Sequence, residues 1–292
     1  MTTQIVLLVT SIWATFQTCS AKQAADVERL TGVMGNVVPY TEFASQYVYP
    51  HGVNGWFPPR YVRDTIMRYA VAYMHDGQNV FDSKISFVGV DWGVGGTTTR
   101  LTQEDTTQEA IIVDIWNPSK RTRECTAKET FTQIPSPERR LGFSGEHGEH
   151  LSDTYLEFIV EELKPLTDLT YRTLPDRDYT FVIGSRVGGL ISEYALCEYQ
   201  DVFGDAGRVS TYWSEGGGIM IAYVRQSLPD SLRCASDCST EALDTLYEQH
   251  QMRVDALMRE AGHTDDENWL AKAFPGDEHC EKKPGRTGSV FL

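Results

Sequence analysis

Three short segments of this sequence carry residue types that nucleophilic chemistry on an acyl group would need. Residues 75–79 read HDGQN, residues 184–189 read GSRVGG, and a third pair consists of Asp237 and His279. In such chemistry an acid orients a histidine, the histidine accepts the proton of the nucleophile, and backbone N–H groups stabilise the oxyanion that forms. We therefore examined whether the chain brings these segments together.

The second segment has the glycine spacing of a nucleophile elbow, G-x-S-x-G, with Arg186 at its centre. Gly184 and Gly188 would allow the close approach of strand and helix that a sharp turn requires. The helix that follows would offer its first backbone N–H groups to an oxyanion. Asp237 and His279 come later, in the order nucleophile, acid, base, and that order fits an α/β-hydrolase.

The elements expected around these segments alternate between short apolar strands and amphipathic helices. Strands are expected at 69–74, 110–116, 179–183, 209–213 and 232–236, with a strand-like stretch at 46–49, and helices at 156–163, 190–198 and 243–258. The first helix is expected to end or kink near Pro165. This pattern predicts an α/β fold in one domain over residues 22–292, with a central, mostly parallel sheet and helices on both faces.

Ligands of such sheets bind at the carboxyl ends of the strands, where the three chemical segments are expected. The polar stretch at 117–150 follows one of these strands, and we expect it to form a lid or a substrate-binding insertion.

Composition narrows the classes of partner. The 292 residues include 41% apolar and 23% charged side chains and carry a formal charge of −15. These values are typical of a globular chain. The acidic balance argues against nucleic acid and against an anionic membrane surface as partners, because both need a basic face. A small-molecule ester or anion is the expected ligand.

The N-terminus resembles a secretion signal. Residues 5–16 read IVLLVTSIWATF and are followed by small and polar residues up to Ala21, after which cleavage is expected. The run is short for a membrane span. We therefore expect residues 1–21 to be a signal and the chain to be periplasmic or secreted, with a buried N-terminal segment as the alternative. The residues before Cys19 argue against lipid anchoring there.

No organic cofactor and no metal ion are expected. The chain lacks a ligand cluster with zinc or calcium spacing, and residues 144–150, with two histidines and two glutamates, are better explained as a solvated loop. The five cysteines after residue 21 are expected to be buried thiols, with a Cys238–Cys280 disulfide as the alternative.

The motifs together resemble the esterase family of α/β-hydrolases that includes esterase D-like and enterochelin-esterase-like enzymes. The matching segments are residues 73–82 (YMHDGQNVFD), 90–92, 121–124, 158–165, 188–192, 237–241 and 276–279, within a region of about residues 45–292. The resemblance implies an α/β-hydrolase fold and carboxylic-ester hydrolysis. It implies that Asp237 is the triad acid and His279 the base, and that the backbone N–H groups near Gln78 and of Val187 form the oxyanion hole.

The chain departs from the family at the nucleophile. The family has serine where this chain has Arg186. A guanidinium stays protonated at neutral pH and has no lone pair for attack. Ser185 precedes the elbow by one residue, and that shift is expected to turn its side chain away from the histidine.

Three functions remain open at this stage. The first is a degenerate esterase with little or no activity, in which Arg186 and the helix N-terminus bind a carboxylate or another anion. The second is an active esterase that uses Ser185 or a water activated by His279, or whose active parent lacked Arg186. The third is a non-catalytic partner-binding module that uses residues 117–150.

Overall fold

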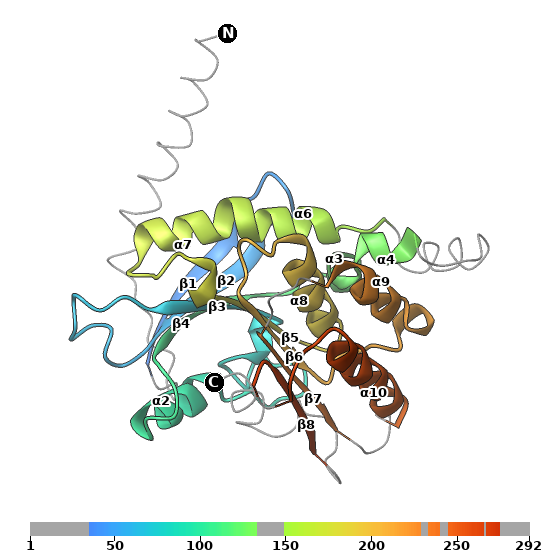
Figure 1. The fold of residues 1–292 in the computed structure, drawn as a ribbon. Coiled ribbons are helices and arrows are strands. Elements are labelled where there is room, and N and C mark those ends of the chain that lie inside the picture. The colour runs from blue at the N-terminus through green and yellow to red at the C-terminus, as the bar shows by residue number, and fades with distance from the viewer. Residues whose placement is uncertain (1–34, 133–148, 229–232, 240–244, 266, 275–292) are drawn as a thin grey trace, which may run out of the picture.

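The structure is a computed structural model that describes residues 35–132, 149–228, 233–239, 245–265 and 267–274 (Figure 1). The expected signal at 1–21, His279 and Cys280 lie outside these residues, as do residues 133–148 of the 117–150 stretch. The Cys238–Cys280 disulfide and the position of the base therefore remain predictions.

The described residues form one eight-stranded sheet in the order β1-β2-β4-β3-β5-β6-β7-β8. The strands are β1 (Asn36–Phe43), β2 (His51–Phe57), β3 (Ala70–His75), β4 (Ala110–Ile115), β5 (Thr180–Ser185), β6 (Asp205–Val209), β7 (Arg233–Ser239) and β8 (Trp269–Phe274). β2 pairs antiparallel with β1 and with β4, and every other pair is parallel. The prediction of a mostly parallel sheet is confirmed.

The central strands are largely apolar because both faces of the sheet are covered. In β4, Ile111 and Val113 join one core cluster while Ile112 joins another on the opposite face. Side chains alternate between faces along a strand, so burial on both faces produces a largely apolar run. This is why β3, β4 and β5 were recognisable in the sequence.

The helices lie on both faces, as expected (Figure 1). They are α2 (Val94–Gln103), α3 (Arg121–Cys125), α4 (Lys128–Thr132), α6 (Ser152–Glu157), α7 (Lys164–Thr170), α8 (Val187–Glu198), α9 (Ile219–Ser227) and α10 (Thr245–Glu260), with short turns η1 (Gly77–Asn79), η3 (Arg177–Tyr179) and η4 (Glu215–Gly217). Val94 of α2 packs into the core cluster on one face, whereas α6, α8, α9 and α10 contribute to the cluster on the other. The fold class predicted from the sequence is correct.

Two strand predictions were wrong. Residues 46–49 are not a strand, since β1 ends at Phe43 and β2 begins at His51. The strand expected at 209–213 lies earlier, as β6, and residues 210–213 form a buried loop beyond it. The sequence of β6, DAGRV, does not read as a buried strand because it contains an arginine. Arg208 is nevertheless fully buried, since it forms an ion pair with Glu193 of α8.

Other boundaries differ in ways that matter for the site. β7 extends to Ser239 because β8 pairs with it as far as that residue, so Asp237 lies within the strand and not after it. The chain does not break at Pro165, because a π-helical segment, η2 (Phe158–Leu163), joins α6 to α7. The 117–150 stretch begins with α3 and α4 and is not an unbroken loop.

Cys125 and Cys197 are buried free thiols, as predicted for these two. Within the part of the chain that the structure describes, no helix has the length and apolarity to cross a membrane.

Candidate active site

The turn between β5 and α8 has the backbone of a nucleophile elbow. Ser185 ends the strand, Val187 begins the helix, and Arg186 between them has φ 57° and ψ −114°. A side chain in this positive-φ region costs about 1–3 kcal/mol of strain. Hydrogen bonds hold the turn, because Arg186 N–H donates to Val209 O at 3.0 Å and Tyr212 N–H donates to Arg186 O at 3.2 Å. The arginine is half-buried.

Gly184 of the elbow has the role that the spacing predicted. A Cβ on Gly184 would lie 2.3 Å from the backbone of Gly188, one turn into α8. Real Cβ contacts are never this short, so strand and helix approach as closely as they do because Gly184 lacks a side chain. A Cβ on Gly188 would instead lie 3.0 Å from Oδ2 of Asp76, so this glycine makes room for the loop after β3. The elbow is intact, and arginine occupies its centre.

The loop after β3 supplies the other side of the expected oxyanion hole. Asp76 has φ 63°, which turns the chain directly into η1, where Gln78 is the middle residue. A Cβ on Gly77 would lie 2.3 Å from Oδ1 of Asp114, so glycine lets this turn pack against β4. Gln78 fixes the turn from its far side, because its Oε1 accepts a hydrogen bond from Asn117 N–H at 3.1 Å.

A clamp that is buried at Asp76 and partly exposed at Arg121 connects this loop to the elbow. The guanidinium of Arg121 donates to both carboxylate oxygens of Asp76, at 2.5 and 2.8 Å, and to the backbone O of Ser185 at 3.3 Å. Asn117 Nδ2 also donates to the Asp76 carboxylate. Asp76 therefore anchors its loop through side chains of the 117–121 segment. Charge-assisted bidentate contacts of this kind are among the strongest and most directional in proteins.

Buried titratable groups surround the clamp. His75 is fully buried, shares a hydrogen bond of 2.8 Å between its Nδ1 and the Tyr155 hydroxyl, and has its pKa lowered to about 4 by burial. It is neutral at pH 7 and suits a structural role. Burial also raises the pKa of Glu215 to about 7, although Thr126 Oγ1 donates to it at 3.3 Å. The site therefore holds one carboxyl group that changes charge near neutral pH.

The expected acid lies at the same edge of the sheet as the elbow. Ser185 of β5 pairs with Val209 of β6, and Val209 pairs with Asp237 of β7. Two inter-strand steps place the backbone of Asp237 about 10 Å from that of Ser185, with β6 between them. Gln78, Arg186 and Val187 share this edge. The contact of Asp237 with His279 stays a prediction.

The Arg121 clamp was missed in the sequence. Arg121 lay within a segment that resembled the esterase family, but no role followed from the resemblance. Asp76 and Arg121 are separated by 45 positions, and no local periodicity marks such a pair. Among the described residues, no group of three or more His, Cys, Asp or Glu side chains is placed to hold a metal ion.

Comparison with known proteins decides the family. The family described as "Putative esterase" matches residues 50–273, which include both β3 and the elbow. The chain belongs to this esterase family. A Bacillus subtilis relative, the uncharacterized protein YbbA, is 24% identical over 223 residues, which are 74% of this chain and 81% of the relative.

Solved esterase structures share the fold. A ferulic acid esterase superposes with a TM-score of 0.57 at 17% identity, covering 84% of this chain and 92% of that one. The enterobactin esterase FES from Shigella flexneri superposes with a TM-score of 0.62 at 16% identity, and the match spans 92% of this chain but 60% of that larger protein. The siderophore hydrolase EstA from Aspergillus nidulans gives a TM-score of 0.56 at 14% identity, over 87% and 92% of the two chains. At these identities the likeness shows the fold alone.

Proposed function

We propose that this protein is an esterase-family member with little or no hydrolytic activity, because Arg186 occupies the position of the nucleophile. The observation that supports the proposal is the backbone of Arg186, which has φ of 57° and ψ of −114° in the turn between β5 and α8. A serine in that turn would attack the ester carbonyl while His279 accepts its proton. The guanidinium has no lone pair for this step and stays charged.

The position of Ser185 supports the same conclusion. Ser185 is the last residue of β5 and its side chain is fully buried within the sheet. Its backbone O accepts a hydrogen bond from Arg121, which fixes it as a strand residue behind the elbow. A nucleophile must reach the substrate carbonyl, so a buried hydroxyl on the strand is poorly placed to replace the one missing from residue 186.

A second candidate function is the binding of a small carboxylate. Its support is the position of Arg186, a half-buried cation at the start of the twelve-residue helix α8. A helix N-terminus and a guanidinium both favour an anion. The carboxylic acid formed from a small ester has the right chemistry, and we expect butyrate to bind here in competition with p-nitrophenyl butyrate.

The natural chain should show no enzyme-like turnover of p-nitrophenyl butyrate. Its turnover rate should stay far below about 1 s⁻¹, which is the lower end of the kcat values that are typical of enzymes. The Ser185→Ala variant should give the same rate, because that hydroxyl takes no part in attack. Initial rates with purified full-length protein measure both. Turnover by the natural chain that Ser185→Ala abolishes would show that Ser185 is the nucleophile.

A further inference from the structure

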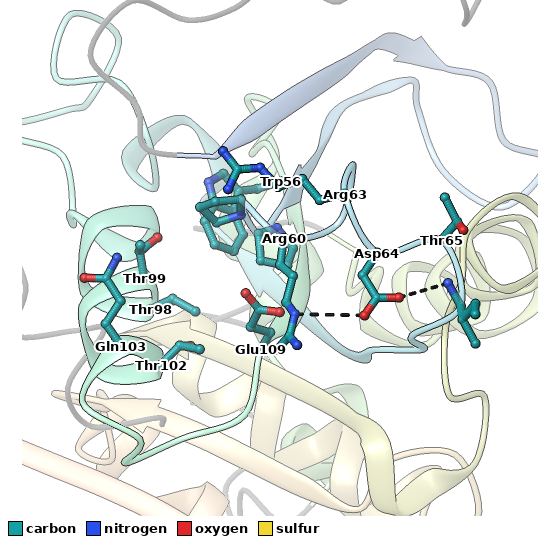
Figure 2. Close-up of a pocket in the computed structure, with 13 residues that line it drawn as sticks. Trp56, Arg60, Arg63, Asp64, Thr65, Thr98, Thr99, Thr102, Gln103 and Glu109 are labelled. Carbon is teal, nitrogen blue, oxygen red and sulfur yellow. Dashed lines mark hydrogen bonds and ion pairs between the residues drawn. The ribbon is translucent and has the colours of Figure 1, made fainter.

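A cavity lies away from the elbow, and Figure 2 shows the residues that line it. It has a volume of about 630 Å³ and opens between α2 and the loop at residues 58–66 that follows β2. Figure 2 shows threonines of α2 on one side, Arg60 and Asp64 on the other, and Glu109 below them. The volume is in the range that holds small-molecule ligands, about 300–1,000 Å³.

The topology separates this cavity from the candidate active site. Glu109 directly precedes β4, and residues 58–66 follow β2, which runs antiparallel to β4. The cavity is therefore at the amino-terminal edge of the parallel strands, whereas the elbow is at the carboxyl-terminal edge. A six-residue strand spans about 20 Å, so the two sites do not share residues.

The wall of the cavity contains buried polar atoms that no described residue satisfies. They are the hydroxyl oxygens of Thr98 and Thr102 and the Oε2 atom of Glu109. On the same helix, Thr99 Oγ1 donates to Gly95 O at 2.7 Å, so a threonine of α2 can satisfy itself locally. A buried polar atom without a partner costs about 1–3 kcal/mol. These three atoms lie just behind the cavity surface, and a side-chain rotation into the cavity would let a ligand supply the missing partners.

The charges around the cavity balance and alternate. Arg60 and Arg63 supply two cations, and Asp64 and Glu109 supply two carboxyl groups. Nε of Arg60 lies 3.9 Å from Oδ2 of Asp64, and Figure 2 shows Arg60 between Asp64 and Glu109. Burial raises the pKa of the Glu109 carboxyl. Such a lining has no net positive charge that would favour an anion. It also lacks the separate positive and negative regions that a zwitterion would need.

We propose that this cavity binds a neutral sugar, of one or two rings, through hydrogen bonds from its hydroxyl groups. A sugar hydroxyl both donates and accepts, so it can donate to Glu109 or Asp64 while accepting from an arginine. The threonine hydroxyls can pair with the same ligand in either direction. This site is independent of the proposed function, because no residue of the elbow or of its clamp contributes to it.

The test is calorimetric titration of the full-length chain with glucose, xylose, maltose and cellobiose, each at about 10 mM, ten times a millimolar Kd. Glucuronate and inorganic phosphate are the anionic comparisons. We expect at least one neutral sugar to bind and both anions to bind more weakly. Failure of all four sugars, or tighter binding of an anion, overturns the proposal.

Variants assign the binding to this cavity. Thr102→Val and Glu109→Gln should each weaken the sugar by about two- to twelvefold, the effect of one hydrogen bond of about 0.5–1.5 kcal/mol. Thr167→Val is the matched control, since Thr167 is a buried helical threonine whose Oγ1 donates to Leu163 O on α7. It should leave the sugar affinity unchanged. Thermal unfolding of each variant checks that the fold is retained, and equal sugar binding by all three variants would place the sugar elsewhere.

Discussion

The Arg186→Ser variant should hydrolyse p-nitrophenyl butyrate faster than the natural chain by a factor of about 10³ to 10⁶. Loss of the serine from an intact triad costs about 10⁶-fold in kcat, and restoring it should recover much of that factor. The turn is already in place, since residue 186 has the elbow backbone and Gly184 and Gly188 meet as the elbow requires. Serine meets the same backbone strain as arginine, so the substitution should not disturb the fold.

The control for this gain is Arg186→Ala. Alanine removes the guanidinium from the pocket but supplies no nucleophile. The Arg186→Ala variant should therefore hydrolyse p-nitrophenyl butyrate at the same rate as the natural chain. Butyrate should bind Arg186→Ser more weakly than it binds the natural chain, because the cation is gone. Equal rates for the serine and alanine variants would mean that some other part of the machinery is absent.

Removal of Glu193 should cause the largest loss of stability. The carboxylate of Glu193 on α8 pairs with Arg208 of β6, and both side chains are completely buried. The guanidinium also lies 4.6 Å from the ring centre of Trp269. In Glu193→Ala the buried cation loses its counter-ion, and we expect the free energy of unfolding to fall by about 3–5 kcal/mol. Domains of this kind are stable by only about 5–15 kcal/mol, so the change should be evident in urea titrations.

An exposed ion pair of this chain provides the matched comparison. Arg225 and Glu260 are 2.8 Å apart, but their side chains are 59% and 62% exposed. Glu260→Ala should cost about 1 kcal/mol or less, because water and salt screen such pairs. The double variant Glu193→Leu with Arg208→Met should recover most of the stability lost in Glu193→Ala. Similar losses of unfolding free energy in Glu193→Ala and Glu260→Ala would show that the buried pair contributes no more to stability than the exposed pair.

The centre of the sheet was predictable because its strands are covered on both faces. β3 and β4 are short and largely apolar, which is typical of strands that are buried on both faces. β6 was displaced in the prediction because a buried arginine interrupts it, and its partner is on a different element. α2 was not predicted because its sequence, VGGTTTRLTQ, has two glycines and four threonines, which are poor helix formers.

Part of the candidate site was likewise predictable from the sequence, and part was not. The elbow was predictable because Gly184 is required by a backbone contact within a few residues of chain. The Asp76–Arg121 clamp was not, because it depends on how β3 and β4 lie side by side and how α3 folds back over them. Asp237 was assigned through its likeness to the family, and the register of β5, β6 and β7 now places its backbone at the same edge of the sheet as the elbow.

The most direct test of the arginine-substituted elbow is labelling with a fluorophosphonate, which reacts with activated serine hydroxyls. Peptide mapping then identifies the labelled residue. We expect no label on the natural chain and a single label at residue 186 of Arg186→Ser. Label on Ser185 of the natural chain would contradict the account, because it would show a working nucleophile one residue before the elbow centre.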